Sequence, residues 1–157
     1  WTSVPFGEED GGFGGGPADL MVLMLRVGKG LVVEPYLANL VLAGGVLRRA
    51  ASAEQKERWL QPIIAGELQA ALAYAEPQSR YDIADLRTTA SADGDNWMLS
   101  GSKSVVFNGG CADLLIGPAR TAGGQNDPDG STLFALPAES NGLKVRSYPT
   151  FDGQQAG

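Results

Sequence analysis

The chain has 157 residues, of which 43% are hydrophobic and 19% charged, a composition typical of a globular protein with a real core. Its formal net charge of −6 argues against a nucleic-acid-binding protein, because such proteins need a basic surface to neutralise phosphates. No apolar run is long enough to cross a bilayer, so no membrane span is predicted. Histidine is absent, which excludes Ser-His-Asp and Cys-His catalysis and every histidine-based zinc site, and we expect no metal site.

The single cysteine, Cys111, excludes an internal disulfide and fits a reducing compartment, so we expect a cytoplasmic protein. No basic residue near it in the sequence would make it a reactive thiolate, and we expect it to pack in the core. The chain opens on Trp1 and closes on Gly157 without an obvious terminal element. We therefore expect it to be a piece of a longer protein.

Helical patterns dominate the first part of the chain, up to about residue 69. Apolar residues from Leu20 to Val27 predict a helix that Gly28 and Gly30 end. A second helix is expected to begin near Pro35, because proline suits the first turn, and to end at Arg49. The stretch "SAEQ", residues 52–55, has the pattern of a capping box and predicts the start of a third helix.

From about residue 70 the patterns become those of short strands. The expected strands are "ALAYA", "LRTTASA", "NWMLSG", "SVVF", "DLLIGPART", "STLFALPA" and "GLKVRSY". Turn dipeptides such as Asp93-Gly94 separate several of them, which is typical of hairpins. The predicted architecture is α+β, with a helical domain at residues 1–69 and an antiparallel, β-barrel-like domain at residues 70–157.

Three motifs are incomplete versions of known ligand sites. The glycine run from Gly11 to Gly16 has no preceding strand, which a dinucleotide-binding fingerprint requires. The stretch "GSKS" at residues 101–104 lacks the residue order of a phosphate-binding loop. Asp127 and Asp129 lack the downstream ligands of a calcium loop. All three are therefore interpreted as loops.

The run "ALAYA" ends abruptly at Glu76-Pro77, and polar residues follow. A carboxylate at the end of a strand can act as a general base. It can also accept hydrogen bonds from backbone N–H groups and hold a turn, and the residue types favour this second role. Both roles stay open at this point. The segment at residues 74–82 is the candidate ligand-binding edge.

Three motifs in the same order and spacing resemble the acyl-CoA dehydrogenase family over essentially the whole chain. They are "VPFGEEDGGFGGGPADL", "SAEQKERWLQPIIAGELQAALAYAEP" and "LRTTASADGDNWMLSGSKSVVFNGGCADLLIGPART". The resemblance implies an N-terminal helical domain, a middle β-domain, and a C-terminal helical bundle that we expect beyond Gly157. The variant "AYAEPQSRYD" is most similar to the branch that contains the small subunit of pimeloyl-CoA dehydrogenase.

The resemblance also implies that the protein binds FAD. The residues that match flavin-contacting positions of the family are Tyr74, Ala75, Arg80, Tyr81, Val105, Val106 and Phe107. Ala75 stands where most of the family has threonine, and Arg80-Tyr81 stands where it has Gly-Ser. Side-chain contacts to the flavin should therefore differ, while backbone contacts can persist. The Arg80 side chain is expected to pair either with an anionic group of the substrate or with Asp82 or Asp85 at the surface.

The reaction implied by the resemblance is α,β-dehydrogenation of an acyl-CoA thioester, in which a carboxylate removes the α-proton and hydride leaves for the flavin. The family's base is expected beyond Gly157, so no catalytic residue is predicted within this chain. Implied partners are the acyl-CoA substrate, an electron-transferring flavoprotein and further subunits in a homo- or hetero-oligomer. The alternatives are a noncatalytic subunit of a heteromeric dehydrogenase, or a related acyl-CoA oxidase or flavin monooxygenase.

Overall fold

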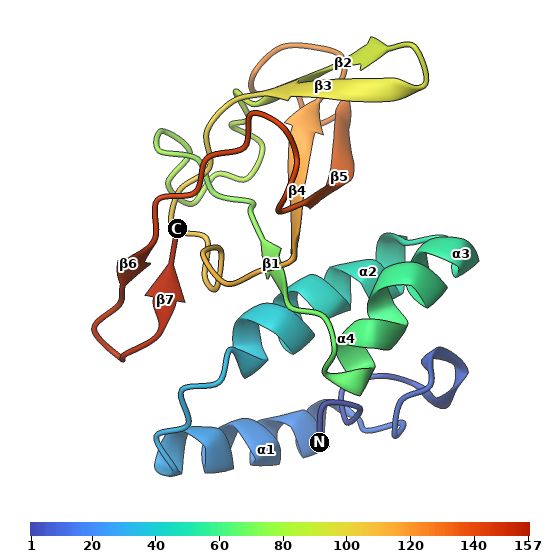
Figure 1. Ribbon diagram of the computed structural model, residues 1–157, viewed down its shortest axis with the longest axis vertical. Helices are drawn as coiled ribbons and strands as arrows, with labels where there is room; N and C mark the ends of the chain where they lie inside the picture. Colours follow the sequence, from blue (N-terminus) through green and yellow to red (C-terminus); the bar gives the residue numbers. More distant parts are fainter.

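The computed structural model describes residues 1–157 and has a helical half and a β half (Figure 1). The helical elements are η1 (Glu8–Asp10), α1 (Pro17–Lys29), η2 (Leu37–Gly44), α2 (Gly45–Ala50), α3 (Ala53–Gln55), η3 (Lys56–Leu60) and α4 (Gln61–Ala65). The strands are β1 (Ala70–Leu72), β2 (Thr89–Asp93), β3 (Asn96–Ser100), β4 (Leu114–Arg120), β5 (Ser131–Pro137), β6 (Tyr148–Pro149) and β7 (Gln155–Ala156). The predicted α+β architecture is confirmed.

The helices begin where the sequence predicts. Pro17 occupies the first turn of α1, and the Asp19 carboxylate accepts from the Gly16 N–H at 2.9 Å. The capping box at the start of α3 is formed in both directions: Gln55 N–H donates to Ser52 Oγ at 3.2 Å, and Ser52 N–H donates to Gln55 Oε1 at 2.9 Å. These local contacts satisfy N–H groups that have no partner inside a helix.

The larger sheet is mixed, with the strand order β1-β4-β2-β3 and β5 paired to the other side of β4. The hairpins β2–β3 and β4–β5 are antiparallel as predicted. However, β1 runs parallel to β4, with Ala70 opposite Leu114, and β2 meets β4 in parallel at Thr89 and Arg120. The predicted antiparallel pairing therefore holds for the two hairpins and not for the contacts of β1 and β2 with β4. Turn dipeptides identify only neighbouring hairpins, whereas parallel strands are joined by long connections.

Three predicted strands are mostly irregular, and in "ALAYA" only Ala71 and Leu72 belong to a strand, β1. In "SVVF", no residue belongs to a strand; Phe107 forms an isolated bridge to Ala156, and Val106 bonds to Gly157. Val105 has a φ of +53°, which breaks the extended conformation that a strand requires. In "GLKVRSY", only the final Tyr148 enters a strand, β6, which pairs with β7 in a small hairpin.

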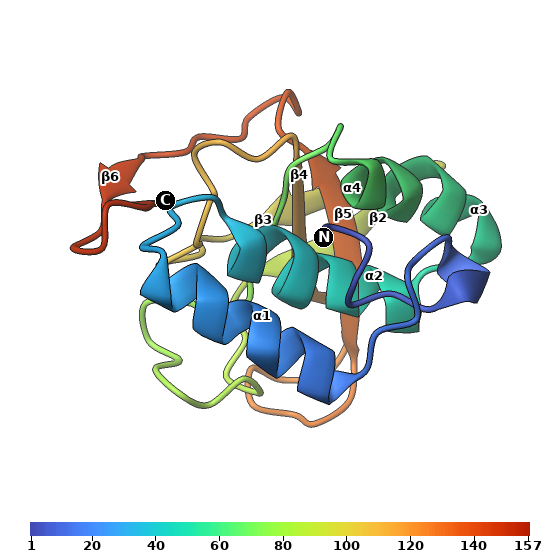
Figure 2. The same cartoon turned by 90° about the horizontal axis from the view of Figure 1, so that it is seen from below.

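One hydrophobic core joins the two halves. Phe6, Leu60 and Ile63 from the helical half pack in the same cluster as Leu114 and Ile116 of β4. Figure 1 shows η2 and α2 passing beneath β1, and Figure 2 shows the helices lying in front of the sheet. Burial of this shared apolar surface is the main force holding the halves together.

A polar contact reinforces the junction between the halves. The Asn39 side chain accepts from Ala70 N–H at 2.8 Å and donates to the Leu68 carbonyl at 3.3 Å. It thereby fixes the chain where the helices end and β1 begins. No helix has the length and apolar character needed to cross a membrane.

Candidate cofactor site

A buried ion pair between Glu76 and Lys103 lies at the centre of the site. The Glu76 side chain is 1% exposed and that of Lys103 is 16% exposed. The Lys103 ammonium donates to Glu76 Oε1 at 2.8 Å and to the Pro118 carbonyl of β4 at 2.8 Å. Taking two charges out of water is costly, so such a pair persists only with good geometry and further hydrogen bonds. The pair joins the chain after β1 to the segment around Lys103.

Three further donors saturate the Glu76 carboxylate. Gln78 Nε2 and Arg87 N–H donate to Oε2 at 2.9 and 2.8 Å, and Thr88 N–H donates to Oε1 at 3.1 Å. Burial raises the pKa of Glu76, but the hydrogen bonds that the carboxylate accepts outweigh burial and lower the pKa to about 2. Burial lowers the pKa of Lys103, and the hydrogen bond and charge of Glu76 oppose that effect. Glu76 is thus suited to holding the backbone and poorly suited to being a general base.

The turn after Glu76 places an arginine where the backbone favours glycine. Ser79 bonds back to the Glu76 carbonyl through both its N–H and its hydroxyl, each at 3.1 Å. Asp82 N–H then donates to the Ser79 carbonyl at 2.8 Å, which closes a four-residue turn. Arg80, the second residue of this turn, has a φ of +49°. Glycine adopts that conformation without strain. This accounts for the Gly-Ser pair that the family resembled by this sequence has at the positions of Arg80 and Tyr81.

Arg80 and Tyr81 extend from this turn into solvent. Tyr81 is fully exposed, and the Arg80 side chain makes no hydrogen bond or ion pair. The two neighbouring carboxylates are engaged elsewhere: Asp82 accepts from a backbone N–H at 3.0 Å, and Asp85 accepts from Gln125 Nε2 at 2.6 Å. The surface ion pair considered for Arg80 is therefore not formed.

Val106 and Phe107 pair on one side only, with the residues Ala156 and Gly157 at the end of the chain. The N–H and C=O of Val106 bond to Gly157 at 2.8 and 3.0 Å, and Phe107 forms a bridge with Ala156. In an antiparallel pair, the backbone groups of successive residues point alternately toward the partner strand and away from it. The N–H and C=O of Phe107 therefore point away from β7, and neither has a hydrogen-bond partner.

Tyr74 offers a second pair of free backbone groups. Ala73 N–H donates to the Ile116 carbonyl of β4 at 2.7 Å. The backbone groups of Tyr74 consequently point to the opposite side, where β1 is the edge of the sheet. Neither the N–H nor the C=O of Tyr74 has a hydrogen-bond partner. Unpaired groups on a strand edge are ready to bind another molecule.

The two segments lie side by side. Ser104 N–H donates to the Ala75 carbonyl at 2.9 Å, next to Tyr74 in one segment and Val105 in the other. We call the row formed by Tyr74, Ala75, Val105 and Phe107 the backbone edge. The φ of +53° at Val105 is a strained conformation for a β-branched residue, and such strain is concentrated at ligand sites. The backbone edge is the candidate cofactor site.

Four of the seven predicted cofactor-binding residues, Tyr74, Ala75, Val105 and Phe107, belong to the two segments that the hydrogen bond between Ser104 and Ala75 joins. The Val106 side chain is buried in a small cluster beneath the sheet, and both its backbone groups pair with Gly157, so it has no free group. Arg80 and Tyr81 lie in the neighbouring turn, and no hydrogen bond joins their side chains to the edge.

The sequence patterns miss several groups that build the site. The stretch "GSKS" predicts only a loop, yet Lys103 within it makes the central ion pair. Arg87 and Thr88 contribute backbone N–H groups, which no side-chain pattern reports. Cys111 is exposed, so its predicted place in the core is wrong. It follows Asn108 in a surface turn, where its N–H donates to the Asn108 carbonyl at 3.1 Å.

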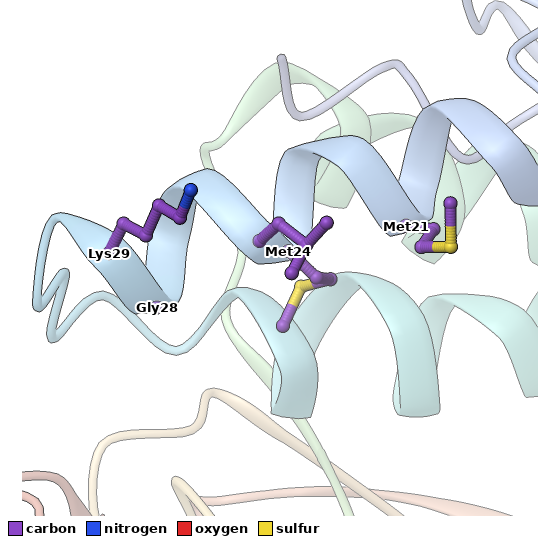
Figure 3. Close-up of a pocket in the computed structure, with 5 residues that line it drawn as sticks. Met21, Met24, Gly28 and Lys29 are labelled. Carbon is purple, nitrogen blue, oxygen red and sulfur yellow. The ribbon is translucent and has the colours of Figure 1, made fainter.

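A shallow hollow on α1 is a separate feature of the molecule (Figure 3). Its lining residues are Met21, Met24, Leu25, Gly28 and Lys29. Lys29 is the single charged residue among them, so the hollow lacks the converging polar groups of a specific ligand site. It lies in the helical half, away from β1 (Figure 1).

The fold defines an α+β protein in which a helical part is followed by a β domain. The chain belongs to the acyl-CoA dehydrogenase family. Residues 1–67 match the family's N-terminal domain, described as "Acyl-CoA dehydrogenase, N-terminal domain", and residues 71–156 match "Acyl-CoA dehydrogenase, middle domain".

Relatives in sequence and in structure agree with this assignment. The acyl-CoA dehydrogenase FadE29 of Mycobacterium tuberculosis is 36% identical over 118 residues, which are 75% of this chain and 30% of FadE29. A probable acyl-CoA dehydrogenase from Mycobacterium abscessus superposes with a TM-score of 0.88 at 26% identity, over 99% of this chain and 42% of that one. A glutaryl-CoA dehydrogenase from Mycobacterium smegmatis, solved with FADH2, has a TM-score of 0.67 at 27% identity, over 76% of this chain and 30% of its own. The chain thus spans less than half the length of each relative.

Proposed function

We propose that the protein binds FAD non-covalently at the backbone edge. The observation that carries this proposal is the pair of residues, Tyr74 and Phe107, whose N–H and C=O groups are free on adjoining segments. The pyrimidine ring of a flavin presents alternating carbonyl and N–H groups along one edge, which such backbone groups can match. The glutaryl-CoA dehydrogenase relative, solved with FADH2, supports the choice of ligand.

All seven predicted residues take part in this proposal, with different roles. Tyr74, Ala75, Val105 and Phe107 form the edge itself. Val106 seats its segment by pairing with Gly157 on one side and packing in the core on the other. Arg80 and Tyr81 flank the edge from the braced turn.

The proposed activity of the whole protein is α,β-dehydrogenation of an acyl-CoA thioester. FAD supplies the acceptor for the hydride that leaves the β-carbon. Within this chain, the ion pair of Glu76 and Lys103 positions the two segments of the edge. Glu76 is not the base that removes the α-proton, because its carboxylate is ionised and fully engaged by donors. That base belongs to another part of the whole protein.

Finer features of the proposal follow from the resemblance. We propose membership of the branch that contains the small subunit of pimeloyl-CoA dehydrogenase, a cytoplasmic setting and a domain boundary between residues 69 and 70. Because the reaction reduces the cofactor, an electron acceptor is needed, and we propose an electron-transferring flavoprotein. Assembly into a homo- or hetero-oligomer is proposed as well. The alternatives are a noncatalytic subunit of a heteromeric dehydrogenase and a related oxidase or monooxygenase.

The test removes one main-chain donor of the edge, and a control variant accounts for the side chain that is lost with it. Phe107→Pro deletes the free N–H, and proline is tolerated where a strand N–H faces outward. The matched control, Phe107→Ala, removes the side chain and keeps the N–H. In the full-length protein we expect Phe107→Pro to weaken FAD binding about tenfold, the value of roughly one hydrogen bond, and Phe107→Ala to have the smaller effect. A wild-type protein that stays colourless after incubation with FAD contradicts the proposal.

A further inference from the structure

Arg120, the last residue of β4, is a buried cation that no carboxylate neutralises. The residue is 6% exposed, and its guanidinium forms no ion pair. It donates instead to four backbone carbonyls: those of Asp127 at 2.9 Å, Asp129 at 2.5 Å, Ala84 at 3.1 Å and Gln125 at 3.0 Å. Burying a charge is costly, so a buried arginine without a carboxylate partner needs a structural or functional explanation.

Two hydrogen bonds from Arg120 fix the segment at residues 84–88, one at each end. The Arg120 side chain holds the Ala84 carbonyl, and the Arg120 N–H donates to the Thr88 carbonyl at 2.7 Å. Between these points, the N–H groups of Arg87 and Thr88 donate to the Glu76 carboxylate. One residue therefore sets the position of two of the donors that hold Glu76.

The loop at residues 121–130 also contacts the segment at residues 84–88. The Gln125 carbonyl accepts from Arg120 and also from Leu86 N–H at 3.0 Å, and the Gln125 side chain donates to Asp85 at 2.6 Å. Arg120 holds this loop through three carbonyls in its middle and C-terminal part, those of Gln125, Asp127 and Asp129. The guanidinium is thus the common centre of the loop and the segment at residues 84–88.

We propose that Arg120 is a positioning residue for the backbone edge. It acts through the segment at residues 84–88, which fixes Glu76, and Glu76 in turn fixes Lys103 and the strained segment at residues 105–107. The proposal rests on the FAD site proposed above and extends it to a residue that does not touch the edge. Main-chain contacts to a ligand are useful only when the main chain is held within a fraction of an ångström.

The experiment uses Arg120→Lys in the full-length protein. Lysine keeps the positive charge but carries a compact ammonium that cannot span four carbonyls. The control is Ile63→Val, a cavity-forming change in the buried core of the helical half, away from the Glu76 network. FAD affinity and amide hydrogen exchange are measured for both variants and the wild type well below their melting temperatures. Arg120→Lys should weaken FAD binding about tenfold, within the range for residues that act through a network.

Hydrogen exchange separates positioning from general loss of stability. The proposal predicts faster exchange at the Arg87, Thr88 and Ser104 amides in Arg120→Lys, and unchanged exchange there in Ile63→Val. If Arg120→Lys does not fold, Gln125→Ala is used, because it removes only the exposed brace to Asp85; it should speed exchange at Leu86 and Arg87 and weaken FAD binding about twofold.

The possible outcomes are distinct. Equal FAD affinity in Arg120→Lys and the control, or unchanged exchange at Arg87 and Thr88, overturns the positioning role while leaving the FAD site intact. A wild-type protein that binds no FAD overturns both the FAD site and the inference built on it.

Discussion

The two halves of the molecule each contain a buried acid paired with a lysine, and they treat the acid differently. In the helical half, Asp10 pairs with Lys56 at 3.0 Å, and Asp10 Oδ2 has no hydrogen-bond partner. In the β half, Glu76 pairs with Lys103 at 2.8 Å, and both oxygens accept at least two hydrogen bonds.

The difference shows what each pair does. The Lys56 side chain is 28% exposed, so that pair resembles a surface contact that ties η1 to η3. The Glu76 pair is enclosed by donors from three separate segments, and it fixes the relative positions of main-chain groups. Only the Glu76 pair has a carboxylate whose two oxygens are both hydrogen-bonded, which is what a support for a ligand site needs.

The largest expected effect concerns activity. Residues 1–157 alone should show no turnover when mixed with FAD, acyl-CoA thioesters and an artificial electron acceptor, because Glu76 is ionised and saturated and no histidine can replace it. Absorbance of the flavin and of the acceptor dye measures this. Sustained, substrate-dependent bleaching would remove the contrast between the two pairs and make Glu76 the base.

The second prediction compares the two acids directly. Glu76→Gln should lower the free energy of unfolding by about 3 kcal/mol, because it leaves the Lys103 ammonium buried without its counter-charge. Asp10→Asn should cost about 1 kcal/mol or less, since Lys56 can reach water. Urea denaturation of both variants measures the difference. Equal losses would mean that the Glu76 network has no special role.

The third prediction uses pH. The pKa of Glu76 is about 2 in the folded protein, below the usual 4.5, so the folded state favours the ionised form. Its contribution is complete above pH of about 4.5 and is lost as the pH falls toward 2; for the whole shift it amounts to roughly 3 kcal/mol. The free energy of unfolding should therefore fall more steeply with acid in the wild type than in Glu76→Gln. Parallel curves would contradict the low pKa.

The smallest expected effect concerns Arg80. Arg80→Gly should raise the free energy of unfolding by about 1 kcal/mol, because glycine adopts the φ of +49° without strain. Arg80→Ala is the control, since alanine also has a side chain and keeps the strain.

Arg80→Ala also tests what the Arg80 side chain binds in the full-length protein. If Arg80 binds a distal carboxylate of the substrate, Arg80→Ala raises the KM for a dicarboxylyl-CoA more than for its monocarboxylyl analogue. If it binds the phosphates of CoA, the KM rises equally for both.

Local chemistry made much of the fold predictable. The capping box at Ser52 and the turn at Asp93-Gly94 involve residues close in the sequence, and both form where the patterns place them. The parallel pairing of β1 with β4 depends on residues about 44 positions apart, and no local pattern encodes that register. The irregular backbone at Val105 was equally hidden, because valine by itself favours a strand.

For the candidate site, the sequence named segments of the chain but not the groups that build it. Family-like motifs pointed to the segments at residues 74–82 and 105–107, and the residue types favoured a turn-holding role for Glu76 while leaving the role of a base open. The free groups of Tyr74 and Phe107 could not be foreseen, because they depend on which main-chain groups β4 and β7 already occupy. Arg120 gave no signal, since its partners are carbonyls, which every residue carries.

FAD titration of three full-length proteins tests the central claim most directly: the wild type, Glu76→Gln and Asp10→Asn, each at a temperature where it is folded. If the Glu76 pair holds the backbone edge and the edge holds FAD, the wild type and Asp10→Asn bind FAD with the same affinity. Glu76→Gln then binds about tenfold more weakly, as expected for the loss of one charge-assisted contact that supports the site. Equal affinity in all three proteins, or no FAD binding by the wild type, would contradict the account.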